Sequence, residues 1–446
     1  MPKAKSVYVC SECGSTSVKW AGQCPECGAW NTLESRRLTT KPAPAAAAVR
    51  RLDDVAADLG AELGQRYPTG FGEFDRVLGG GLAPGAVVLL GGDPGVGKST
   101  LLQQISARLP AELRVCYATG EESLRQVGQR GHRLGLAGAD VAMLAETSLD
   151  SILATAADVG SGVLIIDSMQ TMAVDDISAA PGSVTQLREA VARIVRFAKQ
   201  QEVTVVVIGH VTKEGAIAGP RVVEHMVDTV LYFENDPSSR YTLIRAVKNR
   251  FGATGEMGVF AMTSEGFREV RNPSAIFLSR ETGAEAGSVV SVAWEGSRPL
   301  LVEIQALVAD SGGTPRRLAQ GMEQNRLALL LAILARHGGI EIANDDVFVN
   351  VVGGLRINET AVDLPAAIAI VSSLRDRAVD QHTMCFGELG LAGEVRPVRF
   401  GEERIAAAAT QGFTRCIVPE SNRPRQAPDG MTVVGVRRLR DALDEA

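Results

Sequence analysis

The residues with the clearest chemistry are those of GDPGVGKS, Gly92 to Ser99, which fit the pattern G-x4-G-K-[ST]. The segment follows the strand-like run AVVLLG and leads into STLLQQISARL, a predicted helix. In this order the glycines let backbone N–H groups curl around phosphate oxygens, and the helix N-terminus adds its positive end. Lys98 is then expected to reach the β- and γ-phosphates of ATP, and Ser99 to bind Mg²⁺. The alternative, a chance match, is disfavoured by the flanking strand and helix.

Carboxylates follow two further strand-like runs. GVLIID ends at Asp167, which is expected beside the phosphate loop, where it would hold Mg²⁺ through water; the alternative is an ordinary turn residue. ATGEES places Glu121 and Glu122 after the strand RVCYA, and one of them should orient the attacking water. Glu121 is favoured, with Glu122 in support, although a helix-capping role applies to at least one of them. The predicted nucleotide-binding residues are Gly92, Asp93, Pro94, Gly95, Val96, Gly97, Lys98, Ser99, Thr100 and Asp167.

Four of the seven cysteines lie near the start of the chain, in CSEC and CPEC, separated by ten residues. Four thiolates suit tetrahedral Zn²⁺, and so small a segment needs a metal to hold it. Disulfides or free thiols are the alternative, disfavoured in a chain expected in the cytoplasm. The predicted zinc ligands are Cys10, Cys13, Cys24 and Cys27. The remaining three are predicted to be buried small hydrophobes: Cys116, Cys385 and Cys416.

The stretch VKNRFGATGE, which begins at Val247 directly after the strand-like run YTLIRA, contains a basic tripeptide at Lys248 to Arg250. Such a group at a strand end is ready to hold an anion. The residues alone leave three partners open: a phosphate of a nucleotide, a phosphate of DNA, or water.

The bulk composition bounds the class of protein. The chain has 446 residues, 45% hydrophobic and 22% charged, with a net charge of −6. The length predicts two to four domains, and the acidic balance requires any nucleic-acid site to be local. No apolar run approaches the roughly 18 residues of a membrane span, and the start MPKAKSVYVC is not a signal peptide. A cytoplasmic protein without membrane contact is therefore expected.

The patterns divide the chain into a cysteine unit at residues 1–34, a Pro/Ala-rich linker at 35–66 and two α/β regions at 67–271 and 272–446. Alternating strands and helices in the first region predict a doubly wound α/β core. Within it, SVTQLREAVARIVRFAKQ is expected to be a helix capped by Ser183. Its predicted buried face is Val184, Leu187, Val191, Ile194 and Val195.

The long strings TGFGEFDRVLGGGLAPGAVVLLGGDPGVGKSTLL, GEES, IIDS and HVTKEGAIAGPRVVEHMVDTVLYFE resemble the RecA-like ATPase core of the bacterial RadA/Sms recombination proteins. The segments CSECG…KWAGQCPECGAWNTL and VKNRFG match the same family, so the resemblance covers essentially the whole chain. It implies a homohexameric, DNA-dependent ATPase in homologous recombination and double-strand break repair. The implied partners are single-stranded and branched DNA and the RecA recombinase, alongside which the family drives branch migration.

The resemblance also implies roles for three further sites. In RecA-like rings a Lys/Arg pair at the corresponding strand end reaches the neighbouring subunit's γ-phosphate, and Lys248 and Arg250 match those positions. A solvated strand end and a direct DNA contact are the alternatives. The loop TKEGAIAGP, with Lys213, corresponds to the loop that faces the channel and DNA. His210 is placed like a γ-phosphate sensor, although a lone histidine is more often structural.

Residues 272–446 resemble the proteolytic domain of Lon, on NETAVDLPAAIAI and GELGLAGEVRPVRFGEERIAAA. Ala366 stands at the nucleophile position and Glu402 at the lysine position, so the dyad is lost and a non-proteolytic assembly platform is expected. Ser372 and Ser373 lie about two turns further along the helix and do not substitute. A duplex-DNA surface could be supplied by arginines, although scattered arginines are more often ordinary surface charges: Arg316, Arg317, Arg326 and Arg356. A Lon-type protease and an ATP-dependent assembly switch remain as alternative functions.

Overall fold

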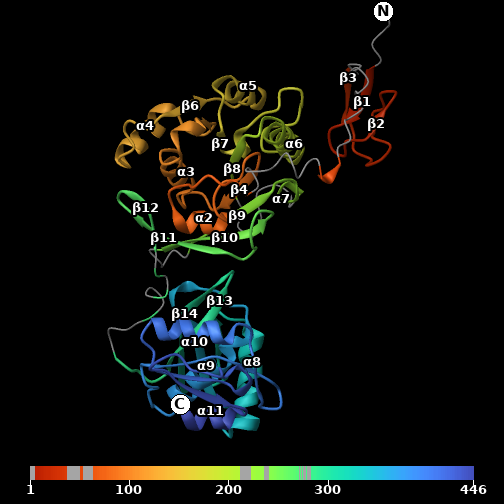
Figure 1. The fold of residues 1–446 in the computed structure, drawn as a ribbon. Helices are drawn as coiled ribbons and strands as arrows, with labels where there is room; N and C mark the ends of the chain where they lie inside the picture. Colours follow the sequence, from red (N-terminus) through yellow and green to blue (C-terminus); the bar gives the residue numbers. More distant parts are fainter. Residues whose placement is uncertain are drawn as a thin grey trace, which may run out of the picture.

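The computed structural model of the protein describes residues 6–37, 51–53, 64–210, 222–235, 241–270, 272, 274, 278 and 283–446. Figure 1 shows three parts along the chain: a small β-ribbon, a central α/β domain and a C-terminal α/β domain. Among the described helices, none combines the length and the apolar character needed to cross a bilayer.

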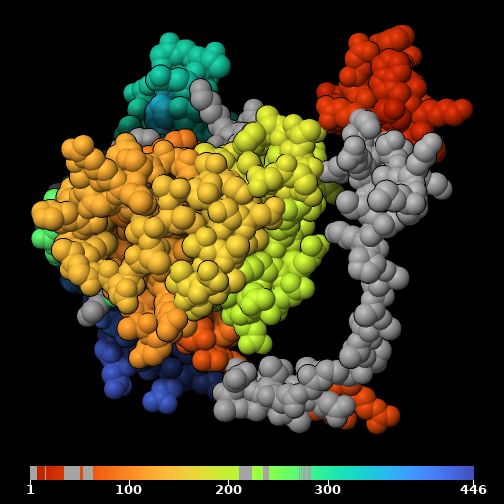
Figure 2. All heavy atoms as spheres, turned by 90° about the horizontal axis from the view of Figure 1, so that it is seen from above, coloured from red at the N-terminus to blue at the C-terminus, as the bar shows by residue number. Residues whose placement is uncertain are grey.

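The ribbon is a three-stranded sheet in the order β2-β1-β3, built from β1 (Ser6–Cys10), β2 (Thr16–Ser17) and β3 (Leu33–Arg37). The predicted boundary at residue 34 thus falls within β3. Figure 2 shows the ribbon as a separate lobe beside the central domain. The hydroxyl of Ser178 in the central domain donates a hydrogen bond of 2.8 Å to the carboxylate of Glu34.

The central domain contains a nine-stranded sheet in the order β12-β11-β10-β9-β4-β8-β7-β5-β6. The six strands from β9 to β6 run parallel, and β10, β11 and β12 extend the sheet as antiparallel strands. The strands are β4 (Val87–Gly92), β5 (Val115–Thr119), β6 (Val141–Ala145), β7 (Val163–Asp167), β8 (Thr204–His210), β9 (Thr229–Asn235), β10 (Tyr241–Asn249), β11 (Met257–Thr263) and β12 (Gly266–Glu269).

Helices cover both faces of this sheet, as expected for a doubly wound fold. α2 (Gly72–Leu78) and α3 (Lys98–Ser106) pack on one face, and α5 (Leu149–Val159) and α6 (Val184–Gln201) on the other. The Ser183 hydroxyl accepts a hydrogen bond from the Gln186 N–H, which confirms the predicted cap. The inclusion of Val184 in the buried face was wrong: it is the first residue of α6 and is 47% exposed. The remaining helices are α4 (Leu124–Arg133) and α7 (Val222–Met226).

The C-terminal domain has a seven-stranded sheet in the order β15-β16-β14-β13-β17-β20-β21. Helices α8, α9 and α11 share a core with one face, and α10 packs on the other. The elements are β13 (Ser288–Glu295), β14 (Arg298–Asp310), β15 (Arg317–Gln320), α8 (Gln324–Ile333), β16 (Asp345–Val351), α9 (Asp363–Leu374), β17 (Thr383–Cys385), β18 (Glu388–Leu389), β19 (Val395–Arg396), α10 (Gly401–Thr410), β20 (Arg415–Pro419), β21 (Thr432–Val436) and α11 (Leu439–Glu445).

Candidate nucleotide site and zinc centre

The phosphate loop and the predicted acidic residues meet at one edge of the central sheet. Strand pairing places Thr119 opposite Asp167 and Gly92 opposite His210. These four residues end parallel strands, and the carboxyl ends of parallel strands are where α/β sheets bind ligands. The sequence prediction of a shared edge is therefore confirmed for the backbone positions.

Lys98 closes the phosphate loop on itself. Its Nζ donates hydrogen bonds to the carbonyl oxygens of Gly92 at 2.6 Å and Asp93 at 2.8 Å. Burial lowers the pKa of Lys98, while Asp167, Glu121 and Asp93 oppose that shift by their negative charge. A desolvated ammonium held by neutral carbonyl groups is poised to bind an anion.

Asp167 is held by two neighbouring hydroxyl groups. Tyr117, fully buried on β5, donates a hydrogen bond of 2.7 Å from Oη to the Asp167 carboxylate, and Ser99 contributes a second hydrogen bond. Burial raises the pKa of Asp167, and both hydrogen bonds counter that rise. A buried carboxylate beside the phosphate loop fits a magnesium-holding role, because a divalent cation would remove the cost of burying its charge.

The two consecutive glutamates take different partners. Glu122 forms an ion pair with Arg130 on α4, and its N–H is 3.2 Å from the Thr119 hydroxyl. Glu121 instead accepts a hydrogen bond from the Ser168 hydroxyl, next to Asp167, and its charge acts on Lys98. The structure thus places Glu121 by the phosphate loop and turns Glu122 towards α4, which supports Glu121 as the base.

The loop backbone fits a bound triphosphate. Gly95 and Gly97 have φ of +82° and +101°, a region that only glycine adopts without strain. A Cβ on Gly97 would lie 2.6 Å from the Met262 methyl and 2.8 Å from the Phe267 ring, so any side chain there would push the loop off its support. α3 begins at Lys98 with no side-chain cap on its first N–H groups, so these donors are available for an anion.

Lys248 and Arg250 lie at the opposite edge of the same sheet. Asn249 pairs with Thr229, which pairs with Val88 near the start of β4. The phosphate loop begins at Gly92, four residues further along β4, or about 13 Å at the rise of a strand. The basic residues therefore lie far from the phosphate loop of their own chain.

Each basic side chain has a partner within the chain. Lys248 Nζ donates to the carbonyl oxygens at the end of α7, at 2.8–3.0 Å. Arg250 bonds the buried carboxylate of Asp228 at 3.2 Å and remains 59% exposed. Both side chains point to the α7 face, whereas Asn249 reaches the Val77 carbonyl on the α2 face. Lys248 and Arg250, two residues apart, thus project the same way, as side chains at this spacing do on an extended segment.

The predicted DNA loop cannot be placed. Lys213 lies outside the described residues, and of His210 only the backbone, at the end of β8, is described. The roles of both residues stay predictions.

The C-terminal domain holds no protease dyad at the expected positions. Ala366 is fully buried in α9, whereas Glu402 is exposed on α10. The hydroxyl groups of Ser372 and Ser373 accept hydrogen bonds of 2.9 Å from the Gly287 and Val308 N–H groups, so both are bound to backbone. The nearby Arg404 is buried and pairs with the carboxylate of Glu359 at 2.6 and 2.9 Å.

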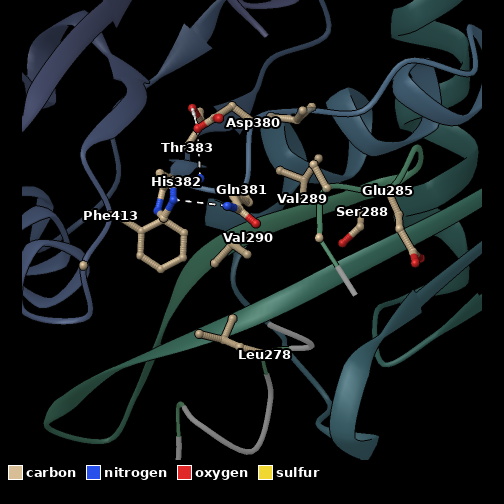
Figure 3. A pocket seen from close by; sticks show the side chains of 14 residues that line it. Leu278, Glu285, Ser288, Val289, Val290, Asp380, Gln381, His382, Thr383 and Phe413 are labelled. Atoms are coloured by element: carbon tan, nitrogen blue, oxygen red, sulfur yellow. Dashed lines mark hydrogen bonds between the residues drawn. The ribbon is translucent and has the colours of Figure 1, made fainter. Parts of the chain in front are cut away.

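Neither lost dyad position lines the pocket of about 230 Å³ in Figure 3, which lies between β13, β17 and the residues around Phe413. Its polar side chains include Gln381 and His382, which hydrogen-bond each other at 3.2 Å.

Of the four arginines considered for a duplex-DNA surface, Arg326 is bound to the buried Asp363 and Arg316 to Asp346. The head groups of these two are thus engaged within the domain.

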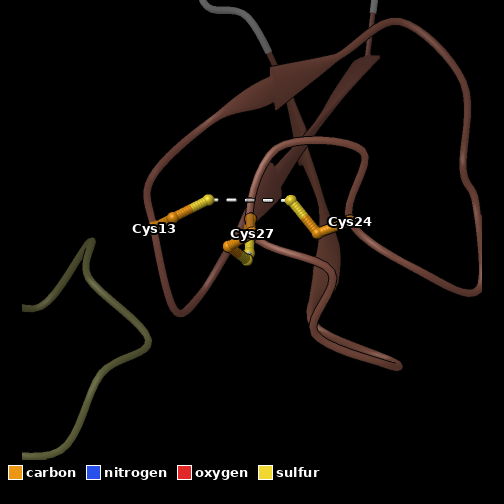
Figure 4. Close-up of side chains that lie close together, drawn as sticks. Cys13, Cys24 and Cys27 are labelled. Carbon is orange, nitrogen blue, oxygen red and sulfur yellow. Dashed lines mark hydrogen bonds between the residues drawn. The ribbon is translucent and has the colours of Figure 1, made fainter.

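The four ribbon cysteines form one cluster, with all four sulfur atoms within 4.8 Å of one another. The Sγ atoms of Cys10 and Cys27 are 3.7 Å apart. Those of Cys13 and Cys24 are 3.6 Å apart, as marked by the dashed line in Figure 4. A tetrahedral zinc with bonds of about 2.3 Å puts its sulfurs about 3.8 Å apart, so the donor set fits Zn²⁺. The Cys27 N–H and the Ser15 hydroxyl lower the pKa of Cys24 to about 6, which favours the thiolate. The three remaining cysteines are buried, as predicted.

Sequence reasoning missed several residues of these sites. Tyr117 could have been found, because a tyrosine in a buried strand requires a hydrogen-bond partner. Ser168, Arg130 and Asp228 carry no such signal, since each acts only through a partner brought near by the fold.

Family models match three segments of the chain. A model described as an AAA domain matches residues 71–216, one described as a rubredoxin metal binding domain matches residues 8–35, and one described as subunit ChlI of Mg-chelatase matches residues 324–422. Together with the sheets described above, they show a mixed α/β protein with an N-terminal zinc ribbon, a RecA-like ATPase core and a ChlI- or Lon-like C-terminal domain.

The chain is similar over its full length to bacterial proteins named DNA repair protein RadA. It is 52% identical to those of Escherichia coli (99% of each chain) and Pseudomonas aeruginosa (100% of this chain and 99% of the relative), and 44% identical to that of Bacillus subtilis (99% of each chain). A solved structure, that of the RadB recombinase, is similar at a TM-score of 0.37 and 19% identity. Both values are too low to support a conclusion about this chain. The match covers 46% of this chain and 99% of the recombinase chain.

Proposed function

Because this chain belongs to the RadA family of DNA repair proteins, we propose that it is a DNA-dependent ATPase that drives branch migration of RecA-made joints in recombination and double-strand break repair. The working form is a homohexameric ring. The observation that best supports a ring is that the phosphate loop and the pair Lys248 and Arg250 lie at opposite edges of one sheet. One chain cannot bring both to one nucleotide, but a head-to-tail neighbour can.

Each residue at the nucleotide edge has one task in this proposal. Lys98 leaves the Gly92 and Asp93 carbonyls to bind the phosphates, and Glu121 orients the attacking water. Mg²⁺, held by Ser99 and Asp167, would neutralise charge on the β- and γ-phosphates. Arg250 of the neighbouring subunit then stabilises the charge that develops in phosphoryl transfer, with Lys248 beside it.

The other parts serve assembly and binding. We assign residues 1–34 to a zinc unit held by the four cysteines, which binds RecA or DNA, and residues 35–66 to a linker. Residues 67–271 form the motor, whose Lys213 loop meets single-stranded DNA in the channel and whose His210 senses the γ-phosphate. Residues 272–446 form a non-proteolytic platform for the ring. The cytoplasm is the compartment in which such a protein meets DNA.

The first test is steady-state ATP hydrolysis with and without single-stranded DNA. DNA should raise the turnover of the wild type, while Lys98→Ala and Arg250→Ala stay flat although they still assemble. Turnover that ignores DNA would favour the assembly switch. An Arg250→Ala variant that hydrolyses ATP normally but no longer responds to DNA would make the basic stretch a DNA contact. Peptides released from casein only with ATP would restore the protease alternative.

A second test addresses the shared site. Lys98→Ala subunits keep Arg250, and Arg250→Ala subunits keep the phosphate loop, so mixing the two inactive variants before assembly creates some complete interfaces. Random mixing should restore about a quarter of the wild-type turnover. Turnover that stays at the level of the separate variants would contradict a site shared between subunits.

A further inference from the structure

The tip of the β13–β14 hairpin of the C-terminal domain is seated on the central domain. Arg298 donates to both carboxylate oxygens of Glu73 on α2, at 2.9 and 3.1 Å, and to the Met257 carbonyl at 3.4 Å. On the other strand of the hairpin, Glu295 accepts a hydrogen bond of 2.7 Å from Arg245 on β10. Figure 1 shows this hairpin reaching towards β10 and β11.

These contacts bracket the turn that carries the basic residues. The β10–β11 turn comprises residues 247–255, which include the last three residues of β10. It is closed by a hydrogen bond of 2.8 Å from the Ala246 N–H to the Glu256 carbonyl and one of 2.7 Å from the Gly255 N–H to the Ala246 carbonyl. Arg245 precedes the turn and Glu256 follows it, so the hairpin tip touches both of its ends. At Gly296 the contact is through backbone: a Cβ there would lie 2.7 Å from the Glu256 Cα.

The charges at this contact are largely removed from water. The side chains of Glu73 and Glu256 are 11% and 5% exposed, and Arg76 on α2 bonds both. Burial lowers the pKa of Arg298, and the neighbouring Arg76 lowers it further, while Glu73 opposes both. A buried network of this kind holds its members in one arrangement, because moving any of them leaves another charge without a partner.

We propose that the β13–β14 hairpin tip positions the β10–β11 turn, so that Lys248 and Arg250 are presented to the nucleotide of the neighbouring subunit. Gly296 and Arg298 are then positioning residues of the ATPase, contributed by the domain that lost the protease dyad. The inference rests on the proposed role of Arg250 in the neighbour's site.

The test is Gly296→Ala, which places a methyl group against the Glu256 backbone. A misplacement of about 1 Å can cost up to about 100-fold in rate, so kcat should fall at least tenfold. The KM for ATP should stay unchanged, since the phosphate loop is untouched. The matched control is Gly430→Ala in the same domain, because Gly430 also has positive φ, +76° against +61°, but no atom within 4 Å of its Cβ position. Gly430→Ala should retain wild-type kcat.

Mixing Gly296→Ala subunits with other inactive variants shows which part of the shared site is damaged. If the turn is displaced, Gly296→Ala subunits have a sound phosphate loop and a misplaced Arg250, so Lys98→Ala subunits should restore turnover and Arg250→Ala subunits should not. Wild-type kcat in Gly296→Ala, or a loss that Lys98→Ala subunits cannot restore, would overturn the inference. Should Gly296→Ala fail to fold, Arg298→Met, which leaves the backbone free of strain, is judged by the same mixing.

Arg250→Ala separates this inference from the proposal beneath it. If Arg250→Ala keeps wild-type turnover, the role of Arg250 in the neighbour's site is wrong, and the positioning inference fails with it. If Arg250→Ala is inactive while Gly296→Ala keeps wild-type kcat, only the positioning inference is wrong.

Discussion

At the scale of single residues, the nucleotide edge is a set of charges that constrain one another. Lys98 is buried and bonded to two backbone carbonyl groups, and Asp167 is buried and bonded to hydroxyl groups. Each would be costly alone, and each becomes favourable when a cation-bearing triphosphate arrives. Buried charged groups that raise the free energy of the empty protein are typical of ligand-binding sites. This agrees with the expected role of Lys98 and Asp167 in binding ATP and Mg²⁺.

Tyr117→Phe tests how Asp167 is held. The phenyl ring keeps the packing of β5, but the hydrogen bond to a charged group, about 1.5–3 kcal/mol, is lost. Burial already raises the pKa of Asp167 and the Tyr117 hydroxyl lowers it, so removing the hydroxyl raises the pKa further. The ionised form then disappears at a higher pH, and the acid limb of the kcat/KM profile for ATP should move to higher pH.

The same variant should bind Mn²⁺ more weakly in the presence of ATP, as measured by electron paramagnetic resonance. Its thermal unfolding serves as the control for packing. An unchanged acid limb together with unchanged Mn²⁺ affinity would show that the Tyr117 hydroxyl has no part in holding Asp167.

At the scale of elements, the zinc ribbon is built by its two Cys-x2-Cys turns rather than by a core. Its described buried cluster consists of Cys10, Cys24 and Leu33, with Tyr8 packed against it. So small a cluster cannot hold three short strands together without metal.

Cys24→Ser should therefore remove the metal. Zinc content should fall from about one ion per chain to none, measured by plasma emission spectroscopy of the dialysed protein. Trp20 and Trp30, both exposed on the ribbon, report its unfolding by fluorescence. The control is Cys116→Ser, because Cys116 is buried in the central sheet, away from the cluster. Full zinc content in Cys24→Ser would contradict a four-thiolate site.

At the scale of the whole molecule, the central and C-terminal domains share part of their packing. Met257 and Val259 of β11 belong to the same apolar cluster as the C-terminal sheet. Together with the contacts of Arg298 and Glu295, this packing joins the two domains, and we expect nucleotide binding at the central sheet to stabilise the C-terminal domain as well.

Arg298→Met should weaken the coupling between the central and C-terminal domains. In a Trp20→Phe/Trp30→Phe background the fluorescence of Trp294 reports on the C-terminal domain alone, since the chain has three tryptophans. A bound ATP analogue should raise the unfolding temperature seen by Trp294 in the parent and much less in Arg298→Met, because the ion pair to Glu73 is gone. The control is Arg415→Met, which breaks an ion pair with Glu445 inside the C-terminal domain. Equal shifts in Arg298→Met and its parent would contradict the coupling.

The sequence alone determined the features that are built from neighbouring residues. The phosphate loop, the cysteine pairs and the aliphatic strands of the central sheet are local patterns, because a few residues of fixed spacing set their own backbone and chemistry. Elements without such a pattern were not predicted: α4 has a single buried residue, Val127, and β12 is four residues long. Apolar periodicity cannot reveal a helix with one buried residue or a strand too short to show a repeat.

Only the tertiary structure decided which groups meet. It turned Glu122 to Arg130 and left Glu121 by Asp167, it put Arg250 at the edge away from its own phosphate loop, and it seated Arg298 on Glu73. The last pair is separated by 225 residues in the chain. Such pairings follow from strand order and domain packing, which depend on the sum of many weak contacts rather than on any short stretch of sequence.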